Sequence, residues 1–274
     1  MALSKEQIAH YREHGWIAPI DIMSEAEAAT LAQTLEAAEA KYPEHLHSEN
    51  RNNAHLAFPF LADLVLHEKI VAAAASLVGA DMSLWSSVLF IKEANSGSFV
   101  SWHQDATYMA LNSDNHVTAW IALTPSIEES GCVAVIPGTH REGIVKHEDT
   151  FGEDNILTRG QKVTHIDESQ AINLELRPGQ MSLHHPWLVH GSLPNKSNQR
   201  RIGIAMQSYM GANVKPEYGE HHVMHIQGAA VPAEFIRSKR PIYECDEEGV
   251  SVREASNKAF SDVLYEGAKV RRKL

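Results

Sequence analysis

The chain has 274 residues, of which 43% are apolar and 22% charged, and its net charge at pH 7 is −11. Such a composition is typical of a folded protein, and the negative charge argues against nucleic-acid or anionic-membrane partners, because both would repel it. No apolar run approaches the roughly 18 residues of a membrane helix, and the first residues show no signal-peptide pattern. Two cysteines do not make a disulfide framework in a chain this long. We therefore expect a cytoplasmic protein that acts on a small molecule.

The first eighty residues have the composition of helices. Ser4 and Ser24 are each followed three residues later by Gln or Glu, which is the capping-box pattern of a helix start. The second of these predicts a helix that is rich in Ala, Glu and Leu and runs to about Lys41. A third helix is predicted over 61–78, where Gly79 gives a stop signal.

From residue 83 the pattern changes to short apolar or alternating runs separated by Gly, Pro, Asn and Asp, which predicts antiparallel strands joined by turns. We expect one domain over 1–274, mainly β with α, built as a jelly-roll core at 83–210 with a helical layer at 1–80. Residues 211–274 are predicted as loops with a helix near 251–264. The predicted strands are 84–92, 100–106, 117–124, 132–136, 171–176, 181–185 and 202–209.

Seventeen histidines make a metal site worth seeking, and a His-x-Asp pair offers one. Residues two apart on a strand point to the same face, so His103 and Asp105 would project together into the barrel. With one distant histidine, such a pair forms the facial triad of non-haem Fe(II) oxygenases, which leaves three coordination positions open. The dipeptide alone is weak evidence, because it occurs by chance in many proteins.

A later segment with three histidines offers the third ligand. We choose His190, because a polar turn then closes a hairpin and returns Arg201 alongside it. A guanidinium in that place can bind a carboxylate through two hydrogen bonds. Its neighbour Arg200 shares a face with apolar residues and suits packing. In contrast, Arg201 shares its face with Gly203 and Ala205, which would leave room for a cosubstrate.

The other histidines are expected to be structural. Adjacent residues on a strand face opposite ways, so His184 and His185 are predicted as scaffold beside the ligand. The three histidines within 221–225 are predicted to lie in a partly exposed loop, and His140 is predicted to stabilise the turn that precedes it.

Further motifs stand in a fixed order along the sequence: His103-Gln104-Asp105, Thr118–Leu123, Gly131-Cys132, Ile136–Arg141, and His190-Gly191-Ser192 with Arg201. Together, from about Asn53 to Tyr209, they resemble the phytanoyl-CoA dioxygenase superfamily, and most of all its bacterial branch related to ectoine hydroxylase. The resemblance implies a cupin-like double-stranded β-helix that uses Fe(II), 2-oxoglutarate and O2.

The resemblance also implies roles for particular residues. In such enzymes 2-oxoglutarate chelates the iron through its C1 carboxylate and keto oxygen, while an arginine, here Arg201, binds the C5 carboxylate. Ser192 matches a position that often assists that arginine. Lys92 is a further candidate for a carboxylate of the cosubstrate or substrate, with a solvated lysine as the alternative. Halogenating relatives replace the metal-binding carboxylate by a small residue, so Asp105 favours hydroxylation of an unactivated C–H bond, with succinate and CO2 as coproducts.

The substrate-side candidates mix hydrogen-bonding and aromatic groups, and packing is the alternative for each. An acidic protein with few clustered cations does not suit a CoA tail. We therefore expect a small polar or zwitterionic metabolite, such as an aminophosphonate, a betaine-like compound or an amino acid. The candidates are Asn53, His55, Gln104, Tyr108 and Trp187.

Several alternatives stay open at this point. The same iron chemistry can give halogenation, cyclisation or epimerisation, and acyl-CoA hydroxylation is a further alternative. A cupin-like protein that binds metal without turnover and a Zn²⁺ hydrolase with the same ligands are two others. The presence of Arg201 favours the oxygenase. The sequence does not decide between a monomer and a homo-oligomer.

Overall fold

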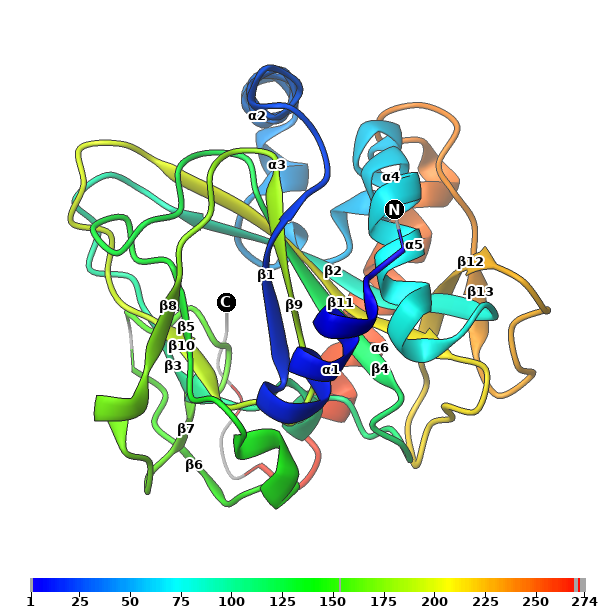
Figure 1. Ribbon diagram of the computed structural model, residues 1–274. Helices are drawn as coiled ribbons and strands as arrows, with labels where there is room; N and C mark the ends of the chain where they lie inside the picture. The colour runs from blue at the N-terminus through cyan, green and yellow to red at the C-terminus, as the bar shows by residue number, and fades with distance from the viewer. Residues whose placement is uncertain (1, 153, 269–270, 272–274) are drawn as a thin grey trace.

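The computed structural model describes residues 2–152, 154–268 and 271, and the side chain of Tyr108 lies outside this description. A seven-stranded sheet packs against a four-stranded sheet, and helices α4 and α5 cover the other side of the large sheet (Figure 1). The mainly antiparallel sheets confirm the predicted jelly-roll class with its helical N-terminal layer. No helix among the described residues is long and apolar enough to cross a membrane.

The two predicted helix starts are confirmed. Ser4 and Ser24 each accept a hydrogen bond from the backbone three residues on, and the reciprocal bond from Gln7 or Glu27 completes both capping boxes. The helices are α1 (Lys5–His14), α2 (Glu25–Lys41), α3 (Pro43–Leu46), α4 (Pro59–Val65), α5 (Glu68–Val78) and α6 (Glu247–Leu264). Short 3-10 helices span Ser48–Arg51, Ala54–Leu56, Asp105–Tyr108, Thr139–Glu142 and Glu168–Gln170.

The prediction of a single helix over 61–78 was wrong, because this segment forms α4 and α5 instead. The break lies at His67, whose backbone is extended (φ −58°, ψ 125°). Glu68 then opens α5, where a carboxylate is favourable near the positive end of the helix dipole. The turn lets both helices lay their apolar sides on the same sheet, which one straight helix could not do.

The strands follow the predicted runs, with further strands near both ends of the sequence and between residues 147 and 192. The large sheet has the order β1-β9-β4-β11-β2-β12-β13, the small sheet the order β3-β10-β5-β8, and β6 pairs with β7. The strands are β1 (Trp16–Asp21), β2 (Met82–Lys92), β3 (Val100–His103), β4 (His116–Ala122), β5 (Val133–Val135), β6 (His147–Asp149), β7 (Gln161–Val163), β8 (Ile172–Leu174), β9 (Gln180–His184), β10 (His190–Ser192), β11 (Arg201–Gly211), β12 (His222–Gln227) and β13 (Ile236–Ser238).

Three differences from the predicted strands have physical causes. Strand β1 lies in the stretch predicted as helical, and it tolerates Pro19 because it is the edge strand of the large sheet. Strands β12 and β13 lie beyond residue 211 and extend the other edge. The strand predicted over 100–106 ends at His103, where the backbone turns into a 3-10 helix.

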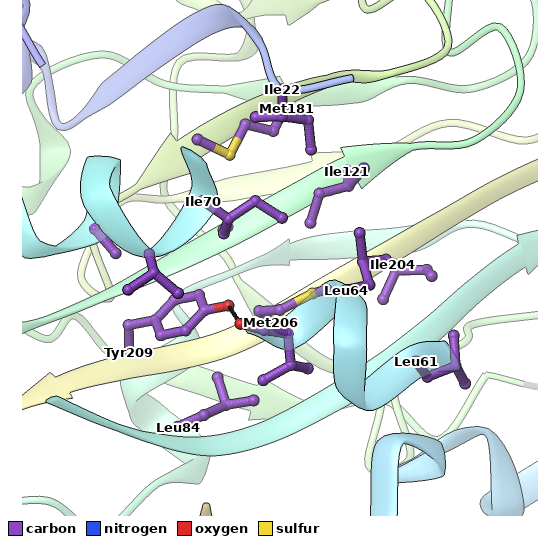
Figure 2. Close-up of a cluster of buried hydrophobic side chains, with 14 of the residues drawn as sticks. Ile22, Leu61, Leu64, Ile70, Leu84, Ile121, Met181, Ile204, Met206 and Tyr209 are labelled. Atoms are coloured by element: carbon purple, nitrogen blue, oxygen red, sulfur yellow. Dashed lines mark hydrogen bonds between the residues drawn. The ribbon is translucent and has the colours of Figure 1, made fainter. Parts of the chain in front are cut away.

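The main core lies between the helices and the large sheet (Figure 2). Ile204 and Met206 of β11 belong to the same buried cluster as Ile70 of α5, and the Tyr209 hydroxyl donates to the Val65 carbonyl oxygen at 2.7 Å. Because strand residues alternate, Arg201, Ala205 and Gln207 of the same strand point between the two sheets. That space between the sheets holds the candidate site.

Candidate metal centre

Two neighbouring strands of the small sheet bring the predicted ligands together. His103 ends β3, His190 opens β10, and the two residues are direct partners in the antiparallel register. Gln104 keeps an extended backbone (φ −118°, ψ 129°), so Asp105 returns to the face of His103 although the strand has ended. All three residues are buried, and one ligand atom from each lies within 4.8 Å of the others.

The two imidazoles are oriented by main-chain carbonyls. Nδ1 of His103 donates to Ser101 O, and Nδ1 of His190 donates to Leu188 O, each at 2.9 Å. These bonds fix the tautomer and turn both Nε2 atoms inward, which is how metal-binding histidines are usually held. Nε2 of His103 lies 3.5 Å and Nε2 of His190 lies 3.7 Å from Oδ1 of Asp105.

The other oxygen of Asp105 has its own partners. Thr118 Oγ1 donates to Oδ2 at 2.9 Å, and Nε2 of His184 lies 3.4 Å from the same oxygen. Burial raises the pKa of Asp105, but the interactions with His190, His103 and His184 outweigh it and hold this pKa well below its usual range. The carboxylate is therefore ionised. Its Oδ1 faces His103 and His190, and its Oδ2 is bound by Thr118 and lies near His184.

His184, which was predicted as scaffold rather than as a ligand, lies in the cavity beside the triad. The alternation that points His185 away from the cavity points His184 into it, where its ring lies 4.5 Å from that of His190. Neither ring nitrogen of His184 makes a hydrogen bond within the described residues. The cross-strand partner of His184 is Thr118 on β4. These two residues are brought together by the pairing of strands that are distant in the sequence, and no local sequence pattern reveals that pairing.

Arg201 is a buried cation that has no acidic partner among the described residues. Its Nη1 donates to Gly131 O at 2.7 Å and its Nη2 to Phe90 O at 3.4 Å, while Nε has no partner within the described residues. The guanidinium lies 5.2 Å from the Trp120 ring, forms no ion pair with any described carboxylate, and lines the same cavity as the triad. Burial lowers its pKa to about 10, which leaves it charged at neutral pH.

The small residues beside Arg201 have a different role from the predicted one. A Cβ atom on Gly203 would lie 2.0 Å from Cζ2 of Trp120. The space over Gly203 is thus filled by the indole that stacks on Arg201, whereas Ala205 does line the cavity.

Lys92 lies behind the cavity rather than in it. Its Nζ donates to Ser192 Oγ at 2.7 Å, to Gly131 O at 3.4 Å and to Leu193 O. Burial and the charge of Arg201 lower its pKa to about 6. Ser192 lines the cavity, so Lys92 acts on the site by holding Ser192 and the Gly131 carbonyl that Arg201 also uses.

Four of the predicted substrate residues are held by contacts within the fold. Nδ2 of Asn53 donates to Ser256 Oγ and Asn257 Oδ1 of α6, at 3.1 and 3.0 Å. The His55 ring bonds Ser87 Oγ at 2.7 Å.

Gln104 is held by side-chain hydrogen bonds and Trp187 by packing and backbone contacts. The Gln104 carboxamide donates to Gly143 O at 2.8 Å and Trp187 O at 2.6 Å, and accepts from the Val145 amide at 2.8 Å. The Trp187 ring packs at 5.6 Å from that of His185. None of the four lines the cavities at the triad, so their contacts give the substrate role no support. The Tyr108 side chain lies outside the described residues.

His140 and the histidines within 221–225 lie outside the triad cavity, and two of the latter lie on β12 rather than in the predicted loop. His140 Nε2 donates to Arg12 O at 3.2 Å and ties its turn to α1. His221, contrary to the predicted exposed loop, is buried and accepts from Trp85 Nε1 at 2.9 Å. Among the residues that the structure describes, the triad is the one group of three His, Cys, Asp or Glu side chains placed to hold a metal ion.

Comparison with known proteins gives a family. The pattern of the phytanoyl-CoA dioxygenase (PhyH) family matches residues 11–203. The chain belongs to this family. The resemblance drawn from the motifs is thereby confirmed.

Curated relatives agree with this assignment. A probable alpha-ketoglutarate-dependent hypophosphite dioxygenase of Stutzerimonas stutzeri is 30% identical over 64% of this chain and 63% of its own length. The peroxisomal phytanoyl-CoA dioxygenase of Homo sapiens is 30% identical over 46% of this chain and 39% of its own length. The match therefore spans less than two thirds of the length of either relative.

Solved structures match over more of the sequence. The non-haem monooxygenase ThoJ, in its apo form, has a TM-score of 0.84 at 27% identity, over 95% of this chain and 98% of its own length. SnoK, a non-haem alpha-ketoglutarate-dependent carbocyclase from nogalamycin biosynthesis, has a TM-score of 0.63 at 28% identity, over 78% of this chain and 86% of its own length. CytC3 with Fe(II) and alpha-ketoglutarate, at 21% identity over 89% of this chain and 97% of its own length, shares the fold with a TM-score of 0.67.

Proposed function

We propose that this protein is an Fe(II)- and 2-oxoglutarate-dependent oxygenase that hydroxylates a C–H bond of a small molecule. In this proposal His103, Asp105 and His190 hold the iron, and Arg201 binds the far carboxylate of 2-oxoglutarate with help from Ser192. The observation that carries the proposal is Arg201, a buried guanidinium that opens into the triad cavity and has no described acidic partner. A charge buried in this way is costly unless a ligand of opposite charge pairs with it.

The donor set fits iron. Two neutral imidazole nitrogens and one ionised carboxylate are the ligands of a non-haem Fe(II) site that keeps open positions for cosubstrates. When bound, the iron supplies the activation of O2 that couples decarboxylation of 2-oxoglutarate to succinate and CO2 with oxidation of the substrate.

The protein's own residues prepare the site for that chemistry. Ser101 O and Leu188 O keep the Nε2 atoms of His103 and His190 turned inward. Thr118 holds Oδ2 of Asp105, which leaves Oδ1 for the metal. Trp120 covers one face of the Arg201 guanidinium, where it excludes water from the carboxylate site.

The finer substrate prediction is part of the same proposal. The substrate is a small polar or zwitterionic metabolite rather than an acyl-CoA, because the protein is acidic and a CoA tail needs a basic surface. Halogenation is disfavoured because Asp105 occupies the position that a halide would need.

The test is metal-dependent turnover of 2-oxoglutarate. The purified protein, reconstituted with Fe(II) under O2, is expected to form succinate from 2-oxoglutarate slowly without substrate and faster with one. Reconstitution with Zn²⁺ or removal of O2 should abolish succinate formation. Iron binding with no succinate under any condition would favour a metal-binding protein, and activity with Zn²⁺ without O2 would favour a hydrolase.

A further inference from the structure

A second cavity begins at the triad and runs to the surface. It has a volume of about 270 Å³, and its inner end is formed by His103 and Asp105. A cavity of about 150 Å³ in a protein core holds one benzene molecule. The second cavity therefore has room for a ring or a branched aliphatic group with a short polar end, and not for a long acyl group.

The walls of this cavity are mainly apolar. They come from strand β2, from the loop before β7 and from helix α6, which are far apart in sequence. The side chains that face one another across it include Val88, Phe90, Ile156, Leu157, Phe260 and Leu264. Such walls favour burial of an apolar group by about 25 cal/mol per Å² removed from water.

The outer end carries charge. Arg51 and Glu49, both on the short helix Ser48–Arg51, line the mouth. The Arg51 guanidinium donates through Nε to Leu46 O at 3.3 Å and lies 3.7 Å from Glu39. Both oxygens of Glu39 already accept from Arg200, at 2.6 and 3.0 Å.

Nη2 of Arg51 is in this ion pair with Glu39, whereas Nη1 makes no hydrogen bond within the described residues and is available to a ligand. Glu49 is exposed and its carboxylate is in no ion pair with a described residue. The mouth of the cavity therefore offers a cation and an anion that are two residues apart in the sequence, next to the apolar walls.

A neutral polar side chain lies where this cavity meets the triad cavity. Gln207 of β11 lines both this cavity and the triad cavity, and its carboxamide makes no hydrogen bond within the described residues. An amide in that position can donate to or accept from a substrate beside the reacting carbon.

We propose that the substrate is an amino acid or a similar zwitterion with a bulky apolar side chain, and this rests on the function proposed above. Its carboxylate pairs with Arg51, its ammonium group lies against Glu49, and its apolar group fills the space between Phe90 and Phe260. This orientation presents a C–H bond of the apolar group, rather than a carbon beside the charged groups, to His103 and Asp105. Arg51 is then a specificity residue of the oxygenase.

The decisive experiment compares matched compounds for stimulation of succinate formation by the iron-loaded protein. Leucine, methionine and phenylalanine are expected to stimulate. Their analogues without the amino group should stimulate more weakly, and the amines without the carboxylate should not stimulate. Quenching of tryptophan fluorescence under nitrogen, with Fe(II) and 2-oxoglutarate present, gives a binding readout without turnover, because Trp85 lines the cavity.

Variants then test the two charges. R51Q is expected to raise the KM for the stimulating amino acid about 10- to 100-fold, the loss typical of one charge-assisted contact, and R51K to recover part of it. E49Q should reduce the preference for the amino acid over its desamino analogue. R12Q, which removes an exposed arginine on α1, is the matched control and should change neither value. Iron content and the unfolding midpoint of each variant show that the fold is retained.

The result that overturns this inference is stimulation by glycine betaine or 2-aminoethylphosphonate with none by apolar amino acids, or an R51Q variant with unchanged KM. Slow succinate formation without substrate would still occur in either case, so the proposed function would stand. Absence of iron binding and of all succinate formation would instead remove the proposed function itself.

Discussion

At the scale of single residues, the two oxygens of Asp105 lie in different surroundings. Oδ1 faces the Nε2 atoms of both histidines, while Oδ2 accepts from Thr118 and lies near His184. A carboxylate held in this way is oriented before any metal binds. The fold thus places a buried hydroxyl and a buried histidine against one carboxylate, which supports the proposed role of Asp105.

His103→Ala, Asp105→Ala and His190→Ala are each expected to abolish iron binding or turnover, because three ligands are the minimum that holds the ion in this site. Metal analysis and oxygen consumption check this. His225→Ala, a histidine outside the site, is the control. Full activity in any one of the three variants would remove that residue from the proposed ligand set.

Thr118→Val should weaken Fe(II) binding about 10- to 100-fold, since outer hydrogen bonds to a metal ligand typically contribute that much. The valine keeps the shape of the side chain and removes only the donor to Oδ2. Titration with Fe(II) under nitrogen measures the effect. Thr124→Val, which removes a hydroxyl bonded to the Ile202 amide, should destabilise the fold without changing iron affinity.

Arg201→Ala is expected to raise the KM for 2-oxoglutarate roughly ten- to thousand-fold, because it removes the buried cation of the cosubstrate site. Arg200→Ala should barely change that KM. Arg200 instead binds Glu39 through both terminal nitrogens, so its loss should lower the free energy of unfolding by about 1–3 kcal/mol. Equal increases of this KM in the two variants would contradict the assignment of Arg201 to the cavity side of β11 and of Arg200 to the opposite side.

At the scale of elements, the alternation of strand β11 serves both the core and the site. Ile202, Ile204 and Met206 pack under the helices, while Arg201 and Gln207 face the space between the sheets. One strand thereby couples the main core to the candidate site. Gly203 lies where Trp120 of β4 crosses this strand.

Gly203→Ala should therefore disturb both stability and cosubstrate binding. The added Cβ would meet the Trp120 ring at 2.0 Å, so the indole must move away from Arg201. We expect a loss of about 1–3 kcal/mol in the free energy of unfolding, as overpacked cores show. The KM for 2-oxoglutarate should rise about tenfold, because the stacking on Arg201 is lost. Gly97→Ala, whose Cβ would make only ordinary van der Waals contacts, should change neither quantity.

At the scale of the whole molecule, several histidines are buried in their neutral form. Burial lowers their pKa values to between about 3 and about 4, whereas an unfolded histidine titrates near 6.5. Below pH 6.5 the unfolded protein therefore binds protons that the folded protein does not. The contribution of these histidines to the free energy of unfolding is therefore fully present above pH 6.5. It is lost as the pH falls toward the pKa values of the folded protein. They are His55 and His185, at about 3, and His116 and His147, at about 4.

The metal-free protein should accordingly lose stability steeply between pH 6.5 and 5, by up to about 1.4 kcal/mol per pH unit for each such histidine. Urea unfolding at a series of pH values measures the slope. His55→Gln should reduce the slope by about one proton, and His165→Gln, at an exposed position, should leave it unchanged. Equal slopes for the wild type and the His55 variant would show that His55 is not buried neutral.

The sequence by itself determined what depends on local pattern. Capping boxes at Ser4 and Ser24 placed the first helices, and alternation assigned Arg201 and Arg200 to opposite faces of one strand. The order of the motifs gave the family. These features could be predicted because hydrogen bonds within a helix turn and the two-residue period of a strand involve only neighbouring residues.

Only the tertiary structure decided which polar side chains lie together and which already have hydrogen-bond partners within the fold. Asn53, His55 and Gln104 looked like substrate ligands, but each is engaged by partners distant in sequence. In contrast, His184 and Arg51 looked unremarkable until strand register and the approach of α6 placed them at the cavities. The reason is physical: a polar side chain is available to a ligand only when the fold leaves it without a partner, and its partners come from elements far away in the sequence.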